Sequence, residues 1–455
     1  MPAPGHGLPR KGCGTLVVRQ QVDPRGIRML CHQETTAVQR PTTWRGFVVL
    51  VTAWAAGAHA DWPHWRGAGG SGASLTARPP VAFGPDRHLA WSVEIPGNGS
   101  SSPVVVGDMV FVTTAVPIEA AAGMLDFRLL CLDRATGRER WSRSAVKAVP
   151  HERTHETNGF ASASPCTDGR RVFAHFGSRG LHAYAVDGTH LWSRDFGDMT
   201  IRNGFGEGSS PTIAGDVVLV PWDHEQGSRL FAVNGTTGEI VWQTPRDEPT
   251  CWATPLVVED PQGVRQVVMN GQRAARGYDL ATGEELWRCS GQTERPVASA
   301  VAADGVAYLA SGFRGAFLGA FDLAGRGDLA GTDRVRWSTN HDTPDIATPL
   351  LSEGRLWYYK EKTGLLTCVD ARTGRPHFES ARIPGVGRTY ASPVAAAGHV
   401  YLTDRSGRIT VIRDAPALDV VAENDVGEGV DATPAPSGDS LFVRGERRLF
   451  RFAAP

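Results

Sequence analysis

Short hydrophobic runs separated by turn residues repeat along the chain from residue 87 onward. A small residue, Ser or Thr and usually Pro precede one apolar run, and Gly-Asp or a similar pair leads into a second. The pattern occurs eight times. Its third position falls at 103, 165, 211, 255, 300, 349, 393 and 434, with spacings of 62, 46, 44, 45, 49, 44 and 41 residues. Strands of this length and period are typical of repeated four-stranded sheets.

A second pattern alternates with the first. "YDLATGEELW" (278–287) is one copy, in which an Ala-Thr-Gly turn leads into a strand carrying a large aromatic residue. We expect this aromatic residue to lie on the outer strand of each sheet and to fill the wedge between neighbouring sheets. The positions predicted to dock the sheets in this way are Trp91, Trp141, Trp192, Trp242, Trp287, Trp337 and Phe378.

The two patterns together predict the fold. In the unit at 253–290 they place strands near 253–259, 264–270 and 274–280, and a fourth that ends past Trp287. Such a twisted sheet cannot bury both faces alone, so each unit packs on the next. The eighth unit has three strands, at 431–436, 439–444 and 447–453, whereas a spare outer strand, "HLAWSVEI", surrounds Trp91. We therefore predict an all-β, single eight-bladed β-propeller over 87–455, closed by this N-terminal outer strand. A linear solenoid, the alternative, would need capping units that are absent from the sequence.

Composition and charge are consistent with this fold. Glycine (53) and proline (30) are frequent among the 455 residues, as in turn-rich β proteins, and the net charge is −1. Residues 1–60 hold seven Lys/Arg and two Asp/Glu, so the rest of the chain is acidic and offers no basic surface for nucleic acid. The cysteines after residue 60 form no C-x-x-C pair. We therefore predict single buried thiols at Cys131, Cys166, Cys251, Cys289 and Cys368.

Residues 1–60 have the features of an export signal. Arg40 and Arg45 precede the apolar run "GFVVLVTAWAAGA", which ends in Ala-His-Ala at 58–60. A positive flank, a short apolar core and an A-x-A site are the parts of a cleavable signal peptide. Translation from Met29 would give a signal peptide of ordinary length. The run is too short and too rich in alanine to favour a transmembrane helix. We predict cleavage before Asp61, a lead-in segment at 61–86, and an exported periplasmic or secreted protein.

The A-x-D-x-x-T-G-x-x-x-W run resembles the repeat of the PQQ (pyrroloquinoline quinone) quinoprotein dehydrogenases. It equally resembles the PQQ-like propellers without cofactor, including the BamB type of outer-membrane assembly lipoprotein. "DWPHWRGAGGSG" (61–72) is also similar to the opening of exported bacterial PQQ-like proteins. The resemblance covers about 87–455 and that opener. It implies the propeller fold, but the same blades carry both enzymes and scaffolds.

The sequence features that distinguish each of these two families from other PQQ-like propellers are missing from this chain. Many of the dehydrogenases carry adjacent cysteines over the cofactor, and this chain has no Cys-Cys pair. The Glu, Asn and Asp that hold calcium in those enzymes have no residue-by-residue match. The BamB type carries a lipid-attachment cysteine after the signal, where this chain has Asp61.

The segments that precede the inner strands predict a binding site, since in a propeller they meet at one mouth of the central channel. Mixed charges and aromatic rings there suit a polar ligand or a protein segment, although polar residues also simply hydrate such channels. The candidate mouth residues are Asn158, Phe205, Glu207, Trp252, Arg295, Asp345, Arg388, Tyr390, Glu428 and Asp431. Arg295 and Arg388 have the geometry to bind carboxylates, which PQQ would supply.

Two short motifs have the residue types of metal sites. "HERTH" (151–155) fits H-E-x-x-H, which binds zinc only when a helix presents both histidines and a third ligand is near. We expect instead a polar rim loop over 145–161, with His151, Glu152 and His155 on it. "DHEQ" (223–226) reads as a solvated hairpin turn rather than a metal cluster.

Two classes of function follow. We favour a non-catalytic binding or assembly scaffold with no cofactor, whose partner is a protein or a polar ligand at the channel mouth. The alternative is a PQQ- and calcium-dependent dehydrogenase that acts on an alcohol or a sugar. No P-loop, G-x-S-x-G or dinucleotide motif points to a further class of enzyme.

Overall fold

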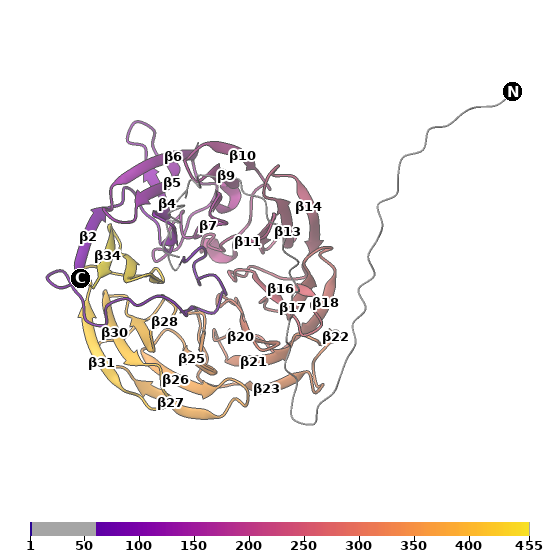
Figure 1. Cartoon of the computed structure of the whole chain (residues 1–455). Helices are drawn as coiled ribbons and strands as arrows, with labels where there is room; N and C mark the ends of the chain where they lie inside the picture. The colour runs from indigo at the N-terminus through magenta and orange to yellow at the C-terminus, as the bar shows by residue number, and fades with distance from the viewer. Residues whose placement is uncertain (2–60, 455) are drawn as a thin grey trace, which may run out of the picture. The chain divides into compact units, whose positions relative to one another are not determined.

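The computed structural model describes Met1 and residues 61–454, and residues 61–454 fold into a ring of eight β-sheets (Figure 1). Each sheet has four antiparallel strands, which run in chain order from the centre outward except in one sheet whose outer strand comes from the N-terminal end, and two sheets gain a fifth, parallel strand. The described residues contain no α-helix, only the 3-10 turns Gly177–Arg179 and Arg202–Gly204. The predicted eight-bladed, all-β propeller is confirmed.

The blades are numbered in chain order. Blade one comprises β3 (Val104–Val106), β4 (Met109–Pro117), β5 (Leu125–Asp133) and β6 (Glu139–Ala148). Blade two comprises β7 (Cys166–Thr167), β8 (Arg171–His175), β9 (Leu181–Ala185) and β10 (His190–Arg194). Blade three comprises β11 (Thr212–Ala214), β12 (Val217–Trp222), β13 (Arg229–Asn234) and β14 (Ile240–Pro245). Blade four comprises β15 (Leu256–Glu259), β16 (Arg265–Met269), β17 (Ala275–Asp279) and β18 (Glu285–Cys289), beside which lies β22 (Gly327–Asp328).

The second half of the ring repeats this order. Blade five comprises β19 (Val301–Ala303), β20 (Val306–Ser311), β21 (Phe317–Asp322) and β23 (Val335–Thr339). Blade six comprises β24 (Leu350–Ser352), β25 (Arg355–Tyr359), β26 (Leu365–Asp370) and β27 (Pro376–Arg382). Blade seven comprises β28 (Val394–Ala396), β29 (His399–Thr403), β30 (Arg408–Arg413) and β31 (Val420–Asp425), beside which lies β1 (Ala73–Ser74). Blade eight comprises β32 (Ala435–Ser437), β33 (Ser440–Arg444), β34 (Arg448–Ala453) and, from the other end of the chain, β2 (Leu89–Glu94).

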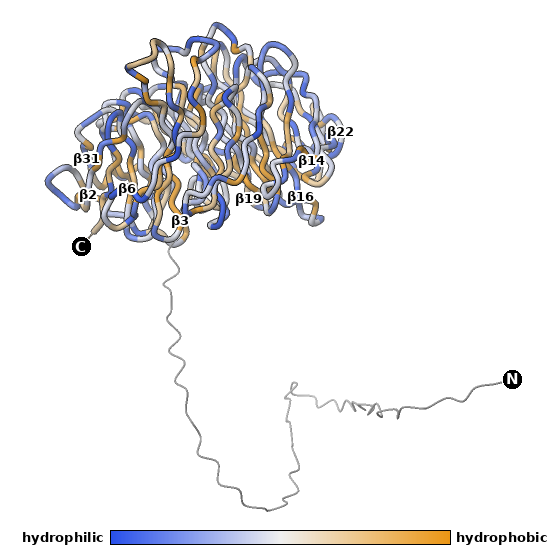
Figure 2. Tube along the Cα trace, turned by 90° about the horizontal axis from the view of Figure 1, so that it is seen from above, coloured by the Kyte–Doolittle hydropathy of each residue, from blue (hydrophilic) through white to orange (hydrophobic). Residues whose placement is uncertain are grey.

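The ring closes as the sequence predicts. Strand β2 pairs antiparallel with β34, with Trp91 opposite Arg451. The apolar core lies between adjacent blades, where buried side chains from two neighbouring sheets meet. Hydrophobic stretches follow the strands, and the loops beyond them are largely hydrophilic (Figure 2).

The outer tryptophans join each blade to the next by a hydrogen bond and a close ring contact. The indole N–H of Trp91 donates to the carbonyl of Arg134 at 3.0 Å, and the indole covers Gly137 in the Thr-Gly turn of blade one. A Cβ on Gly137 would lie 2.7 Å from that ring. Glycine is therefore needed there for space as well as for its positive φ of 72°. Trp141, Trp192, Trp242 and Trp337 make the same N–H bond and cover the matching glycine of the following blade.

Trp287 and Phe378 join their blades differently. The indole N–H of Trp287 donates to the side chain of Gln266 in its own blade, and Gln266 Nε2 donates to the carbonyl of Leu323 in blade five. The side chain of Phe378 has no N–H to donate, and its ring packs on Trp357 of its own blade. Arg355 connects blades six and seven by donating to the carboxylate and the carbonyl of Asp414.

The serines and threonines that precede the inner strands form a second, inner connection. The hydroxyl oxygen of each accepts the backbone N–H of its counterpart in the preceding blade, at 2.8 to 3.1 Å, and the eighth bond returns to blade one. The hydroxyl ring consists of Ser102, Ser164, Ser210, Thr254, Ser299, Thr348, Ser392 and Thr433. All eight residues are buried, because only 1 to 5% of each is exposed.

The lead-in segment crosses the central channel, as the indigo trace in Figure 1 shows. Trp62 exchanges two backbone hydrogen bonds with Val105 of blade one, and the carbonyl of Pro63 accepts the N–H of Thr167 in blade two. Arg66 donates to the carbonyls of Pro349 and Pro393, in blades six and seven. The lead-in segment therefore bridges opposite sides of the ring.

The lead-in segment also fills the outer side of blade seven, which has no outer tryptophan. The N–H of Phe83 donates to Oδ1 of Asn424, and Asn424 Nδ2 donates to the carbonyl of Val81. The five cysteines in the described part of the chain are buried and free, as predicted. None of the elements within 61–454 is a helix long and apolar enough to cross a membrane. The predicted signal peptide lies outside the described residues.

Candidate functional site

A cavity of about 360 Å³ opens at the channel mouth, where the chain enters the inner strands. We call this cavity the cup. Six of the ten candidate mouth residues line it, namely Asn158, Phe205, Trp252, Arg295, Tyr390 and Asp431. Side chains that precede blades two, three, four, five, seven and eight thus meet around one space.

The other four candidates lie outside the cup lining. Asp345 stands behind the wall, where it pairs with Arg295, and Arg388 lies against Tyr390, with its guanidinium 5.6 Å from the ring centre. The carboxylate of Glu207 points away, into a smaller pocket, and accepts the N–H and the hydroxyl of Ser178, while burial raises its pKa. Glu428 accepts the backbone N–H groups of Arg447 and Arg448 and serves as a loop anchor.

One wall of the cup is cationic. Arg295 and Lys362 share the carboxylate of Asp345, at 3.1 and 3.2 Å, and that carboxylate is almost fully buried. The Arg295 guanidinium also lies 3.5 Å from the ring centre of Phe313, a cation–π contact that holds it in place. Two positive charges therefore face the cup over a single negative one.

The wall formed by blades seven and eight is anchored by a paired arginine. Arg405 holds Asp431 bidentately, at 2.5 and 2.8 Å, and lies 4.1 Å from the ring centre of Tyr390. The Asp431 carboxylate in the lining is thereby neutralised by an arginine behind it. This leaves Arg295 and Lys362 as the dominant charge on the cup surface.

The opposite wall is aromatic. The Phe205 and Trp252 rings lie 6.4 Å apart, and the indole N–H of Trp252 donates to the carbonyl of Gly206 at 2.8 Å. The His155 imidazole meets the edge of Phe205 at 5.4 Å. These contacts hold the rings rigidly, so the wall presents preformed apolar surface.

The floor of the cup is formed by the lead-in segment and the hydroxyl ring. Trp65 and seven of the eight ring hydroxyl residues, all except Thr348, belong to the lining. The buried Arg66, with 2% of its surface exposed, crosses the channel next to Trp65, and burial lowers its pKa to about 9. The channel is therefore closed below the cup, and a ligand can enter only from the mouth.

The rim loop has no helix, and its histidines serve different purposes. It begins at 149 rather than 145 because β6 continues to Ala148, which pairs with Leu125. The His151 ring is hydrogen-bonded to the carbonyl of Met199, Glu152 accepts the N–H of Ile201, and His155 bonds Thr157. No three His, Cys, Asp or Glu within residues 61–454 form a group that could hold a metal ion. The H-E-x-x-H motif therefore lies in a loop and not on the helix that a zincin site requires.

The rim loop also reaches across the mouth. The hydroxyls of Thr157 and Tyr390 form a hydrogen bond at 3.4 Å, although 233 residues separate them in the chain. Asn158 fixes this part of the loop by donating to the carbonyls of Phe205 and Glu207. The loop thus joins the segment before blade three to the segment before blade seven at the mouth.

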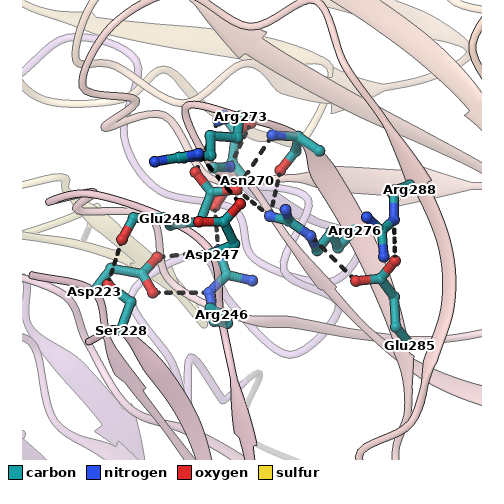
Figure 3. A network of polar contacts seen from close by, with 12 residues as sticks. Asp223, Ser228, Arg246, Asp247, Glu248, Asn270, Arg273, Arg276, Glu285 and Arg288 are labelled. Carbon is teal, nitrogen blue, oxygen red and sulfur yellow. Dashed lines mark hydrogen bonds and ion pairs between the residues drawn. The ribbon is translucent and has the colours of Figure 1, made fainter.

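The interpretation of residues 223–226 as a solvated turn is wrong for its first two residues. Asp223 and His224 are buried, and Asp223 binds Arg246 bidentately at 2.8 and 3.0 Å (Figure 3). A second buried pair, Glu248 with Arg276, lies beside it, and the Tyr278 hydroxyl accepts from Arg246. Burial raises the pKa of Asp223, but its arginine partner keeps the pair intact. This network is a structural bridge, because it joins blades three and four through Arg246–Tyr278 and Glu248–Arg276, and it lies outside the cup lining.

Several residues of the cup were not predicted. Lys362 and Phe313 in the lining, and Arg405 behind it, follow the second strands of their blades instead of preceding the inner strands, and Trp65 belongs to the lead-in segment. A sequence signal existed for one of them. The chain has only four lysines against 43 arginines, and two of the four, Lys360 and Lys362, fall in one turn of blade six.

The cup offers partners for PQQ but not for the calcium ion that accompanies it. Arg295 and Lys362 are suitable partners for the carboxylates of PQQ, and the cup has aromatic walls. Calcium requires several carboxylate or carbonyl oxygens around one point. The described residues offer no cluster of acidic groups for it, since Asp345 is held by Arg295 and Lys362, and Asp431 by Arg405. The residues present do not fit the metal-dependent form of the cofactor site.

Comparison with protein-family models identifies the family. The model described as outer membrane protein assembly factor BamB, a PQQ-like repeat, matches residues 81–186, 180–333 and 270–452. These matches cover most of the chain, so the chain belongs to this family. A comparison with curated protein sequences finds no match.

Solved structures confirm the fold and span both classes of function. A europium-containing methanol dehydrogenase is similar with a TM-score of 0.62 at 12% identity, covering 87% of this chain and 98% of its own. The quinohemoprotein alcohol dehydrogenase from Comamonas testosteroni has a TM-score of 0.60 at 13% identity, covering 87% and 80%. BamB from Moraxella catarrhalis has a TM-score of 0.54 at 14% identity, covering 80% and 97%. At these identities the likeness shows the fold alone.

Proposed function

We propose that this protein is an exported, non-catalytic binding propeller that holds a segment of a partner protein in the cup. The observation that carries the proposal is the closed floor. The lead-in segment bridges the channel with Arg66 and Trp62, so the charged and aromatic side chains of the mouth surround a blind cavity with one entrance. Preformed walls of this kind favour binding because little ordering is required of them.

The absence of a catalytic constellation around the cup supports binding over chemistry. Asp431 in the lining and Asp345 behind the wall are each paired with arginine or lysine. Within the described residues no metal-binding cluster adjoins them. A family that contains assembly factors is consistent with a partner protein as the ligand.

A pull-down from periplasmic extract tests the proposal. Arg388→Ala/Tyr390→Ala removes the Tyr390 ring from the cup lining together with the arginine that lies against it, and we expect loss of the partners that the wild-type protein recovers. Val241→Ser is the matched control, since Val241 is exposed on the outer strand β14, far from the lining. Loss of partners from the Val241 variant together with full recovery by the double variant would place binding on the outer edge of the ring and refute the proposal.

The alternative, a PQQ- and calcium-dependent dehydrogenase, is supported by the cationic wall and by the fold shared with quinoprotein enzymes. Its test is direct. PQQ and Ca²⁺ are added to the purified mature protein, which is then desalted and assayed for dye reduction with an alcohol or an aldose. Retained cofactor absorbance together with substrate-dependent dye reduction would replace the binding proposal by the enzyme. We expect neither.

A further inference from the structure

The hydroxyl ring at the floor of the cup is a set of hydrogen-bond donors without acceptors. Each oxygen already accepts a backbone N–H from the neighbouring blade. Each hydroxyl has one proton to donate, and among the described residues none of the eight donates it to a protein acceptor. Seven of these residues line the cup, so their protons are available to a ligand there.

Two further donors at the cup have no acceptor. The indole Nε1 of Trp65, at the floor, and the Nε of Arg295, at the wall, are buried and unbonded in the described structure. Arg295 is itself well covered, since 12% of its side chain is exposed. Buried donors without acceptors are costly, and a ligand that supplies acceptor atoms removes that cost.

The charges of the lining select an anion. Arg295 and Lys362 face the cup with Asp345 behind them, and Asp431 is neutralised by Arg405. A group with several acceptor oxygens and a negative charge matches both the donors and the cations. A protein N-terminus is cationic and rich in donors. It would be repelled by Arg295 and Lys362 and would offer no acceptor to the hydroxyl protons.

The closed floor then decides which part of a protein can supply that anion. A chain cannot pass through the channel, because Arg66 and Trp65 obstruct it, so only a chain end or a side chain can reach the hydroxyl ring. A cavity of about 360 Å³ limits what enters to a short stretch of such an end. The aromatic wall of Phe205 and Trp252 suits an apolar last side chain.

We propose that the cup binds the free C-terminal carboxylate of a partner protein that ends in an apolar or aromatic residue. The carboxylate contacts the hydroxyl ring, Arg295 and Lys362, and the last side chain packs on Phe205 and Trp252. This inference rests on the proposed function and deepens it by naming the part of the partner that is recognised.

The test compares two hexapeptides of glycine and serine that end in phenylalanine, each labelled with fluorescein at the N-terminus. One has a free C-terminal carboxylate and the other a C-terminal amide. Fluorescence anisotropy with the full-length mature protein should show saturable binding of the acid and at least about tenfold weaker binding of the amide, as for a lost charge-assisted hydrogen bond. Sodium sulfate at constant ionic strength should compete with the acid, since it offers oxygens to the same donors.

The two neighbouring lysines provide a matched pair of variants. Lys362 lines the cup and pairs with Asp345, whereas Lys360 pairs with Asp342 outside it, and the two side chains are similarly exposed. We expect Lys362→Met to weaken the acid about tenfold and to leave the amide unchanged, and Lys360→Met to alter neither. Equal loss in both variants would overturn the inference, because it would reflect the general charge of the surface.

The remaining outcomes separate this inference from the proposed function. Equal binding of acid and amide would overturn carboxylate recognition while leaving the cup as a binding site. If neither peptide binds, carboxylate recognition is overturned. The proposed function then stands when Arg388→Ala/Tyr390→Ala still loses partners in the pull-down, and falls with the inference when that variant recovers them. Binding of sulfate without either peptide would assign the cup to small inorganic anions and overturn the inference.

Discussion

The backbone N–H of Thr433 donates to the hydroxyl oxygen of Ser102 at 3.0 Å, across 331 residues of chain. This bond joins blade eight to blade one and completes the hydroxyl ring. Ring closure therefore rests on two independent joints, since β2 also pairs with β34 at the outer side of the same blade. The closure completes the four-stranded sheet of blade eight, so no terminal blade lacks its outer strand.

Removing the Ser102 hydroxyl should destabilise the ring. Ser102→Ala leaves the buried N–H of Thr433 without an acceptor, and an unsatisfied buried donor costs about 1–3 kcal/mol. Urea unfolding of the wild type and the variant measures the difference in the free energy of unfolding. Ser102→Thr keeps the hydroxyl and is the control. An alanine variant as stable as the threonine variant would show that the hydroxyl ring contributes nothing to closure.

Trp91 should contribute more to the free energy of unfolding than its hydrogen bond alone. Trp91→Ala removes a ring of which 8% is exposed, together with the N–H bond to Arg134, and we expect a loss of about 3–5 kcal/mol. Trp91→Phe retains much of the packing and should lose less. Thermal and urea unfolding measure both. A Trp91→Ala melting temperature within error of the wild type would contradict the placement of this strand in blade eight.

Asp223 should contribute far more to the free energy of unfolding than Asp247, which belongs to the same part of the molecule (Figure 3). Asp223→Ala leaves the fully buried Arg246 guanidinium without its carboxylate, and breaking a buried pair costs about 3–5 kcal/mol. Asp247 pairs with Arg273 at the surface, where Asp247→Ala should cost about 0–1 kcal/mol. Comparable losses in the two variants, measured by urea unfolding, would argue that the network of Figure 3 is not a structural bridge.

His175 should make the fold less stable in mild acid. Burial lowers the pKa of His175 to about 4, below the 6.5 of an ordinary histidine, so the unfolded chain takes up the proton first as the pH falls. The stability that this group contributes is complete above pH 6.5 and is lost as the pH falls toward 4. Between pH 7.5 and 5 the loss is about 2 kcal/mol.

The control for this prediction is a surface histidine. His175→Gln should reduce the fall in the free energy of unfolding between pH 7.5 and 5, whereas His341→Gln, at an exposed site, should not. Urea titrations at the two pH values give the difference directly. A fall of equal size in the wild type and in His175→Gln would mean that other groups account for the acid sensitivity.

The mature protein should begin at Asp61. The prediction comes from the A-x-A site at 58–60, and cleavage there leaves Trp62 in place to pair with Val105. N-terminal sequencing of the protein recovered from periplasm or medium checks it, and Ala60→Arg should block processing. Recovery of an uncut chain from the cytoplasm would refute export.

The architecture was predictable because it rests on local repetition. Each blade repeats the Ser/Thr-Pro entrance and the Thr-Gly turn, and Trp91 without a matching last strand at the C-terminus indicated how the ring closes. Two details were not visible in the pattern. The glycines of the turns admit the indole of the preceding blade, and the Ser and Thr hydroxyls join in a ring. Both depend on the neighbouring unit and not on the unit itself.

The candidate site was predictable in part. Phe205, Trp252 and Arg295 were found because they precede inner strands, and that position alone brings them to one mouth. Glu207 and Glu428 share the position but turn to backbone and serine partners nearby. The direction of a side chain depends on its competing neighbours, which the spacing of a repeat does not encode.

The sequence by itself determined the number of blades, their four-stranded form and the strand exchange at Trp91, because these follow from periodic contacts between adjacent repeats. Only the tertiary structure decided the cup. Its floor comes from Trp65 and Arg66 in a segment outside the repeat, and its cationic wall comes from Lys362 and Arg295, which meet at Asp345 from three separate stretches of chain. Such contacts join residues far apart in sequence with no period between them, and they exist only once the ring has closed.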